Sequence, residues 1–343
     1  MFENLKKTGE VFIIAEIGQN HQGDLDIARE YIRVMAAEGA DAIKFQTRNN
    51  RYLFDSEAYS TAYASENSFA DTYGAHRERL ELKPEWLKIL RADCEQHKVK
   101  FMSTPFDEPS LELLGKVGID IIKIASFDLG NLPFIDRIAR LQRPVVISVG
   151  GGKLDQIRAS VKLLLKYKLE VAVLHCVSEY PCDYRRLGLE NIELLEREFP
   201  DCVVGSSDHF NGTLSGPIAY LKGARVFEKH VTLNRAWKGT DHSFALEPEG
   251  FRKFVRDIKR VRHMMPAKPM EEIGEENVFR KLGKSLIAHI DIKAGDQLTL
   301  ANLSGRIFNA QYIPVRESNR VIGSRALRDI AKGDPINYAD IEG

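Results

Sequence analysis

Residues 203–232, VVGSSDHFNGTLSGPIAYLKGARVFEKHVT, hold two short apolar runs that each end in polar residues, with a helical stretch between them. The same alternation organises residues 11–265. Its apolar runs are VFIIAE (11–16), AIKFQT (42–47), KFMSTPF (100–106), IIKIAS (121–126), PVVISV (144–149), VAVLHC (171–176), VVGSSDH (203–209) and RVFEKHVT (225–232). Strand–helix alternation repeated eight times is typical of a (β/α)8 TIM barrel, so we predict this α/β fold.

Polar side chains gather at the carboxyl ends of the predicted strands. In a barrel of this kind those ends converge on one face, where active sites lie. They carry Glu16, Lys44, Gln46, Thr104, Lys123, Ser126, Ser148, His175, Ser207, His209, Lys229 and His230. So many polar groups at the same end of successive strands predict an enzyme.

The composition narrows the choice of compartment and partner. Lys+Arg and Asp+Glu both total 49 of 343 residues, so nothing favours nucleic acid or an anionic membrane surface as a partner. No apolar run approaches the roughly 20 residues of a membrane helix, and the first residues lack the apolar core of a signal peptide. The cysteines form no CxxC pair. We therefore expect reduced thiols and a cytoplasmic protein.

Three segments divide the chain. We assign residues 1–265 to the catalytic barrel and 266–283, which contain Pro and Glu without a strand signal, to a linker. Residues 284–343 contain two similar segments around DIKAGD and DIAKGD, each with a predicted strand, and form a small β-rich domain. Within the barrel, the polar stretch 48–83 is interpreted as a loop that covers the substrate, with an inert insertion as the alternative.

Two histidines, His209 and His230, end adjacent predicted strands. Their imidazoles can converge to bind a divalent metal ion and leave positions open for water or substrate. The alternative is a pair of hydrogen-bonded histidines at the barrel rim. Asp241 and His242 follow the last strand and could add a ligand or a substrate contact.

Two lysines, Lys44 and Lys123, lie inside apolar strands, where an unpaired ammonium is costly. An anionic ligand would explain both, and backbone amides of Gly150–Gly152 could help to bind phosphate. The hydroxyl donors for such a ligand would be Thr104, Ser126, Ser148 and Ser207. A Schiff-base lysine is a second possibility. In a third, strand-end acids such as Glu16 neutralise the lysines, although Glu16 could also hold a substrate hydroxyl or move a proton.

The motifs at the strand ends resemble those of the sialic acid synthase (N-acetylneuraminate synthase) family, which includes pseudaminate and legionaminate synthases and spore-coat polysaccharide enzymes. The matching motifs are AEIGQNHQG, KFQT, STPFD, KIAS, LHCVSEYP, SDH, EKHVT and GTDHSFALEP. The resemblance covers nearly the whole chain and implies that residues 284–343 form an antifreeze-like (SAF) domain.

The resemblance implies condensation of phosphoenolpyruvate with the open-chain aldehyde of an amino sugar, giving a nonulosonic acid and phosphate. It implies that His209 and His230 bind a divalent cation, Mn²⁺ above all and otherwise Mg²⁺ or Co²⁺, and that Glu16 and Lys123 join them in catalysis. The implied substrate-binding residues are Lys44, Gln46, Thr104, Ser126, Ser148, Ser207, Tyr180, Asp241 and Arg306. Arg306 would come from the C-terminal domain of the partner in a domain-swapped homodimer.

The sequence departs from the family pattern beside the predicted sugar site. Val149–Gly151, Phe127–Asp128, Ser178 and Trp237–Lys238 replace residues common elsewhere in the family, which leaves the acceptor sugar open. Two other functions also remain open: a class I aldolase or lyase using Lys123, and a non-catalytic sugar-binding barrel.

Overall fold

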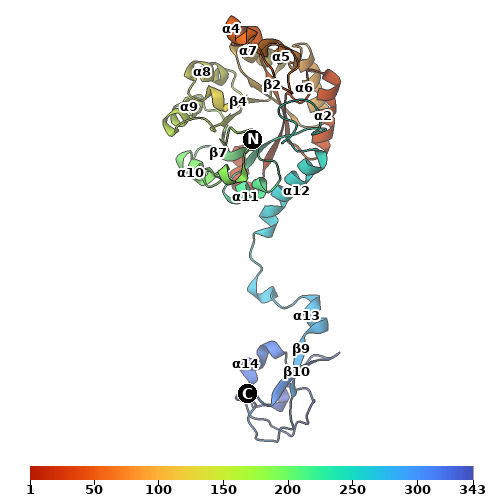
Figure 1. The fold of residues 1–343 in the computed structure, drawn as a ribbon. Helices are drawn as coiled ribbons and strands as arrows, with labels where there is room; N and C mark the ends of the chain where they lie inside the picture. The colour runs from red at the N-terminus through yellow and green to blue at the C-terminus, as the bar shows by residue number, and fades with distance from the viewer. Residues whose placement is uncertain (343) are drawn as a thin grey trace. The chain divides into compact units, whose positions relative to one another are not determined.

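The computed structural model describes residues 1–342, apart from the side chain of Arg280. It divides into two compact units, residues 1–265 and the residues from Pro266 onward. Figure 1 shows the first unit as strands enclosed by a ring of helices. None of the described helices is both long and apolar enough to cross a membrane.

The first unit is a closed barrel of parallel strands paired in the order β1-β2-β3-β4-β5-β6-β7-β8, with β8 pairing back to β1. The strands are β1 (Phe12–Gly18), β2 (Ala42–Thr47), β3 (Lys100–Pro105), β4 (Ile121–Ile124), β5 (Val145–Ser148), β6 (Val171–Cys176), β7 (Val203–Asp208) and β8 (Val226–His230). Each coincides with a predicted run to within a few residues. The predicted TIM barrel is therefore confirmed.

The helices outside the barrel follow the strands in turn. They are α2 (Leu25–Ala37), α6 (Trp86–Gln96), α7 (Glu108–Val117), α8 (Leu132–Arg140), α9 (Leu154–Lys166), α10 (Asn191–Glu198), α11 (Ser215–Leu221) and α12 (Pro248–Met264), with short 3₁₀ turns η1 (Ser126–Asp128) and η2 (Tyr184–Arg186) in two loops. Asp24 caps α2 by accepting a hydrogen bond from the amide of Ile27, as its type predicts.

Alternation along the strands separates two hydrophobic cores. Residues such as Ile43, Val173 and Phe227 face the helices in the larger core. The smaller core fills the barrel interior. Its members are Phe2, Leu5, Phe12, Ile14, Ala42, Met102, Ile121, Val146, Ala172, Leu174, Val203 and Val226.

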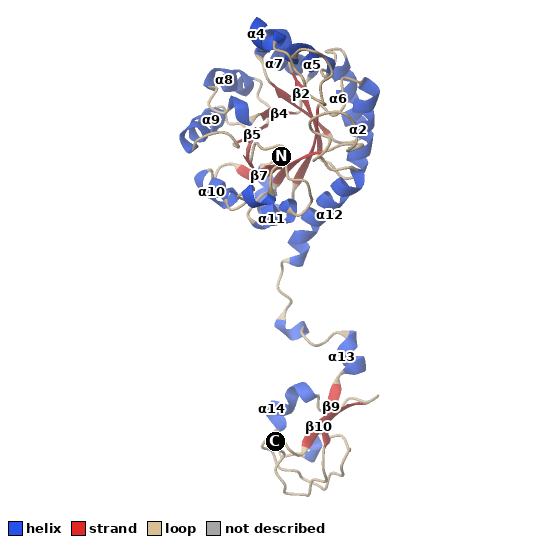
Figure 2. Cartoon of the chain, viewed as in Figure 1, coloured by secondary structure: helices blue, strands red, loops and turns tan. Residues whose placement is uncertain are grey.

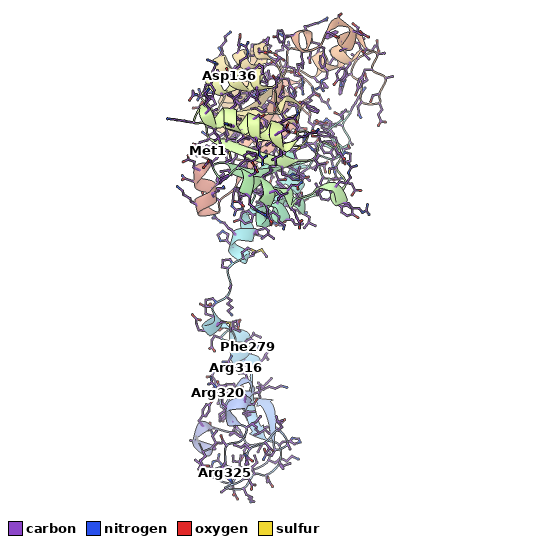
Figure 3. All side chains as sticks on the ribbon, turned by 90° about the vertical axis from the view of Figure 1, so that its left-hand side faces the viewer. Met1, Asp136, Phe279, Arg316, Arg320 and Arg325 are labelled. Atoms are coloured by element: carbon purple, nitrogen blue, oxygen red, sulfur yellow. The ribbon has the colours of Figure 1, made fainter. Side chains whose placement is uncertain are left out.

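Helix α1 (Glu3–Thr8) closes the amino-terminal end of the barrel. Phe2 and Leu5 belong to the interior core, and the Phe2 ring meets that of Phe12 edge-on at 5.8 Å. The Glu170 carboxylate fixes this segment by accepting from the amide of Phe2 at 2.6 Å, beside Met1 in Figure 3. Because apolar side chains fill the interior at this end, the inward-facing polar side chains lie toward the other end.

The polar stretch between β2 and α6 forms short helices: α3 (Asn50–Leu53), α4 (Ser56–Ser60) and α5 (Tyr73–Arg79). Rings of Phe54, Tyr63, Tyr73 and His76 pack on one another, with Tyr63 and His76 at 4.6 Å. Helices of one or two turns leave no repeating apolar pattern, which is why the sequence shows none here.

The second unit has its own small core, formed around β9 (Lys284–Ala288) and β10 (Leu303–Ile307), which pair antiparallel. The remaining elements, drawn by type in Figure 2, are η3 (Met270–Glu272), α13 (Asn277–Leu282), η4 (Val315–Glu317), α14 (Ser318–Val321) and η5 (Tyr338–Asp340). The two similar segments meet where Ile292 and Ile330 exchange backbone hydrogen bonds. The strand predicted in the second segment is wrong, because that segment makes isolated bridges only.

Candidate active site

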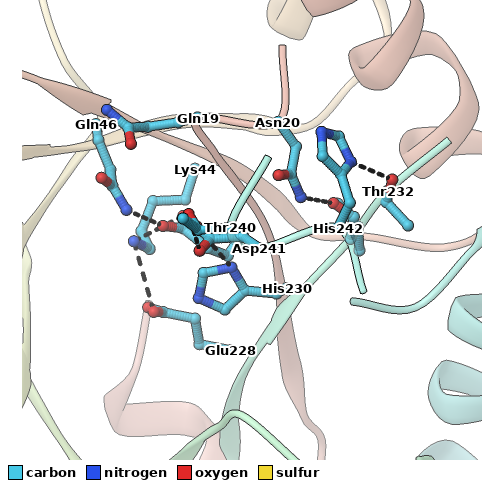
Figure 4. Close-up of polar contacts among 12 residues, drawn as sticks. Gln19, Asn20, Lys44, Gln46, Glu228, His230, Thr232, Thr240, Asp241 and His242 are labelled. Atoms are coloured by element: carbon cyan, nitrogen blue, oxygen red, sulfur yellow. Dashed lines mark hydrogen bonds and ion pairs between the residues drawn. The ribbon is translucent and has the colours of Figure 1, made fainter. Parts of the chain in front are cut away.

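Inward-facing residues at the carboxyl ends of the strands form a buried charged network. Figure 4 shows Lys44, Gln46, Glu228, His230 and Asp241 around a common space. These side chains come from β2, from β8 and from the loop after β8, and β1 lies between the two strands in the barrel. The strand order therefore brings together residues far apart in the sequence.

Lys44 and Glu16 form a close ion pair within this network. Lys44 Nζ lies 2.7 Å from Glu16 Oε2 and donates to Thr104 Oγ1 at 3.3 Å. The second Glu16 oxygen accepts from Gln46 Nε2 at 2.8 Å. Burial raises the pKa of Glu16, and the nearby Glu228 carboxylate adds to this shift against the opposing effect of Lys44. Glu16 is thus the counter-ion of Lys44, which was one of its predicted roles.

Glu228 is the site residue that sequence reasoning missed. Its carboxylate lies 3.5 Å from Lys44 Nζ and 3.7 Å from Lys123 Nζ, and it accepts from Ser207 Oγ at 3.2 Å. Burial opposes its ionisation, but Lys123 and Lys44 hold the pKa of Glu228 at about 2. The signal was present, because Glu228 precedes His230 by two residues and alternation places both on the inner face.

Lys123 is held less tightly than Lys44. The 3.7 Å separation from Glu228 exceeds hydrogen-bond distance, and burial lowers the pKa of Lys123. Nearby, the buried Ser148 hydroxyl has no hydrogen-bond partner among the residues that the structure describes. Ser126 Oγ accepts from the amide of Gly150 at 3.1 Å, so this amide does not point at a ligand. Lys123 and Ser148 therefore have unused capacity for an anion.

The two histidines converge as predicted, with ring centroids 5.3 Å apart. His209 Nδ1 donates to the carbonyl of Val177 at 2.7 Å, which leaves Nε2 with a free lone pair in the neutral ring. Burial and His230 lower the pKa of His209 to about 4, and burial also lowers that of His230. Both rings are therefore neutral at pH 7, as metal ligation requires.

The unpaired ring nitrogen of His230 also suits the binding of a divalent cation. His230 Nδ1 is buried without a hydrogen-bond partner within residues 1–342, although Asp241 Oδ2 lies 3.8 Å away. No group of three or more His, Cys, Asp or Glu side chains in this range could hold a metal ion. The pair would thus leave most coordination positions to water or substrate.

Two further predicted residues line the mouth. The Tyr180 ring, about half exposed, lies 4.0 Å from the His209 ring. Asp241 is close to Gly18, where an added Cβ would lie 3.4–3.5 Å from Glu16, Gln46 and Asp241 together. Polar side chains from β1, β2 and the loop after β8 thus converge on the backbone of Gly18.

Three other polar residues of the barrel, His175, Lys229 and His242, lie outside the common space. His175 and Lys229 face the outer side of the barrel: His175 Nε2 donates to the carbonyl of Leu187, and Lys229 pairs with Asp208. His242 bonds Thr232 and turns away from His230 (Figure 4). Arg306 is exposed on β10 of the second unit, opposite Ser285. In that unit Arg316, visible in Figure 3, instead pairs with Glu275 at 3.0 Å.

Comparison with known proteins gives consistent matches. The NeuB family matches residues 31–269. The N-acetylneuraminate-9-phosphate synthase of Mus musculus is 33% identical over 332 residues, 96% of this chain and 92% of that protein. The N,N'-diacetyllegionaminic acid synthase of Campylobacter jejuni is 33% identical over 344 residues, 98% and 99% of the two chains. The crystal structure of an N-acetylneuraminic acid synthetase from Leptospira borgpetersenii superposes with a TM-score of 0.69 at 30% identity, over 80% of this chain and 92% of that one.

Proposed function

The chain belongs to the NeuB family, and on this premise we propose that it condenses phosphoenolpyruvate with the open-chain aldehyde of an N-acylated amino sugar. The products are a sialic-acid-type nonulosonic acid and inorganic phosphate. Such acids are used in surface or spore-coat polysaccharides, and a spore coat polysaccharide protein of Bacillus subtilis is 35% identical over 258 residues.

Phosphoenolpyruvate binds at the lysines in this proposal. Its phosphate and carboxylate need cationic and hydroxyl donors, and Lys123 and Ser148 both have unused hydrogen-bonding capacity. Lys44, Thr104, Ser126 and Ser207 complete the set. This single observation carries the proposal: two buried ammonium groups and an unpaired buried hydroxyl share one end of the barrel with the imidazole pair.

His209 and His230 would hold the divalent cation, Mn²⁺ by preference. When bound, this ion polarises the aldehyde oxygen as a Lewis acid. Tyr180, Gln46 and Asp241 hold the sugar with its aldehyde beside the imidazoles. Their positions orient the acceptor carbon toward the phosphoenolpyruvate pocket.

The covalent steps balance as follows. C3 of phosphoenolpyruvate forms a bond with the aldehyde carbon, the aldehyde oxygen takes up a proton from water, and cationic character develops at C2. A water molecule adds at C2 and loses a proton to Glu16, whose raised pKa suits this role. Cleavage of the C–O bond at C2 then releases phosphate, the C2 hydroxyl gives its proton to the departing phosphate, and a 2-keto acid remains. The Glu228 and Glu16 carboxylates stabilise the developing positive charge.

Phosphate release tests this proposal. We expect release only when phosphoenolpyruvate, an aldose and Mn²⁺ are all present, and none after chelation with EDTA. A panel of N-acetylmannosamine, its 6-phosphate and a di-acetamido trideoxyhexose, followed by mass spectrometry of the product, identifies the acceptor. His230→Ala should abolish release, whereas His97→Ala, outside the barrel interior at the end of α6, should not. Full activity in EDTA would refute the metal-assisted reaction.

A class I aldolase is the second candidate, because burial lowers the pKa of Lys123, as Schiff-base lysines require. Borohydride reduction with pyruvate distinguishes the two. Trapping of a covalent adduct that is absent from Lys123→Met would favour the aldolase, and we expect no adduct.

We also propose that residues 284–343 are an antifreeze-like domain that delivers Arg306 to the barrel of a second subunit. Subunit mixing tests this arrangement. Arg306→Ala and His230→Ala subunits should each be inactive alone, yet a mixed dimer regains activity, since one barrel then keeps His230 and receives Arg306. Absence of complementation, or a monomer in sedimentation at micromolar concentration, would contradict the proposal.

A further inference from the structure

We propose that Asp208 and Lys229 are positioning residues: as a buried ion pair on the outer side of the barrel, they fix the backbone that aims the His209 imidazole at the metal. The inference rests on the metal-binding part of the proposed function. Neither residue faces the interior of the barrel, and neither has a role in the reaction steps above.

Alternation in the two strands explains why this pair lies outside the barrel. Asp208 and Lys229 are register partners in the parallel pairing of β7 and β8. Their neighbours Ser207 and Glu228 contact each other inside the barrel, so Asp208 and Lys229 point outward. Lys229 is 1% exposed and Asp208 is 6% exposed. Their ion pair, 2.9 Å from Lys229 Nζ to Asp208 Oδ2, is therefore shielded from water.

Both side chains bind the residue that follows His209. Asp208 Oδ1 accepts from the amide of Phe210 at 2.7 Å, and Lys229 Nζ donates to the carbonyl of Phe210. Ser215, at the start of α11, donates to the other Asp208 oxygen. The Phe210 amide belongs to the peptide that joins it to His209. The contact therefore fixes the backbone torsion directly after the His209 Cα.

Two further hydrogen bonds, made by His209 itself, hold its backbone and its ring. The carbonyl of His209 accepts from the amide of Cys182 at 3.1 Å, and its Nδ1 donates to the carbonyl of Val177. The latter bond selects the ring tautomer but leaves the ring free to follow its backbone. Because a metal ligand must be held within a fraction of an ångström, we infer that the Asp208–Lys229 pair supplies the rigidity of the His209 end.

The alternative is that the pair only stabilises the fold, and charge removal separates the two roles. Lys229→Met alone leaves the Asp208 carboxylate buried and unpaired, so this variant can fail to fold. The double variant Asp208→Leu/Lys229→Met replaces the pair with apolar side chains and buries no unpaired charge, so it should fold. It lacks both the carboxylate that holds the Phe210 amide and the ammonium that holds the Phe210 carbonyl. A control, Leu164→Ala in the α9 core, should lower stability without touching either strand.

Mn²⁺ titration of the purified full chain gives the first readout. We expect the dissociation constant of the double variant to be about 10- to 100-fold higher than that of the wild type, as for other residues that support a metal ligand, and that of Leu164→Ala to be unchanged. Wild-type affinity in the folded double variant would overturn the inference. Absence of Mn²⁺ binding by the wild type would overturn it together with the metal-binding part of the proposed function.

Nitrogen NMR of the histidine rings in metal-free protein gives a second readout, which needs neither metal nor substrate. The wild type should show His209 as the single tautomer protonated at Nδ1. In the double variant the ring should move with its backbone away from the Val177 carbonyl, so we expect a mixture of tautomers. An unchanged His209 spectrum would overturn the inference even if the protein binds Mn²⁺ and releases phosphate, so the inference and the proposed function can fail separately.

Discussion

Replacement of Glu228 by Gln would remove the carboxylate that lies between the two site lysines, 3.5 Å from Lys44 and 3.7 Å from Lys123. An ion pair near this separation is worth about 4 kcal/mol at an effective dielectric constant of about 20. Removal of one partner from a buried pair typically costs about 3–5 kcal/mol. The fall in the Glu228 pKa from 4.5 to about 2, caused by the same two lysines, corresponds to about 3 kcal/mol. We therefore expect Glu228→Gln to lower the free energy of unfolding by about 3 kcal/mol at pH 7.

The pH dependence follows from the direction of the shift. A depressed carboxyl pKa contributes stability above its unfolded value of 4.5, and this contribution is lost as pH falls toward 2. The difference between Glu228→Gln and the wild type should therefore narrow below pH 4.5. Added inorganic phosphate should stabilise the variant more than the wild type, because Lys123 then has no carboxylate partner and Lys44 keeps only Glu16 as its counter-ion.

Urea unfolding followed by circular dichroism measures these differences. The matched control is Glu198→Gln, which breaks the exposed pair with Arg158 and should change stability far less, because solvent screens this pair. Equal stability of Glu228→Gln and Glu198→Gln at pH 7 would refute the electrostatic reasoning. So would a phosphate response no larger than that of the wild type.

Three further outcomes are expected. Gly150→Ala should raise the KM for phosphoenolpyruvate, because the added Cβ would lie 2.8 Å from the Cys176 carbonyl oxygen. In the control Gly250→Ala, in α12, the added Cβ meets only ordinary contacts. Equal KM values for the two variants would contradict the prediction. Phe2→Ala should lower the free energy of unfolding by about 3–5 kcal/mol in a urea titration, and a loss under about 1 kcal/mol would show that α1 does not close the barrel core. Burial lowers the pKa of His21 from 6.5 to about 4. As the pH falls between these values, the free energy of unfolding of the wild type should therefore drop by about 1.4 kcal/mol per pH unit because of this group. The same pH slope in a His21→Gln variant would show that His21 does not contribute.

The barrel could be predicted because each strand is a short apolar run that ends in polar residues. The apolar run shows that the strand is buried, and its polar end shows which end of the strand lies at the active-site face. AIKFQT and VAVLHC match β2 and β6 residue for residue. The convergence of His209 and His230 followed from strand order alone. Which ring nitrogen is free did not follow, because His209 binds a backbone carbonyl, that of Val177, and the side-chain pattern does not reveal which carbonyl lies beside a ring.

The face of each strand residue was the weaker part of the prediction. In the run EKH, all three residues are polar, so apolar alternation gives no direction and Lys229 was grouped with His230. The pleat places Glu228 with His230 and turns Lys229 outward to Asp208. An acidic residue two positions before a metal-ligand candidate could have identified Glu228, whose nearest cations come from β2 and β4.

The apolar plug formed with α1 closes the amino-terminal end of the barrel, so in the proposed reaction substrates and products would share the opposite end. Lys123 and Ser148 lie on the strands themselves, whereas Tyr180 is half exposed beside His209. We therefore expect phosphoenolpyruvate to bind before the sugar, and the nonulosonic acid to leave before phosphate. A few apolar side chains at the far end of the barrel would thus impose an ordered kinetic mechanism.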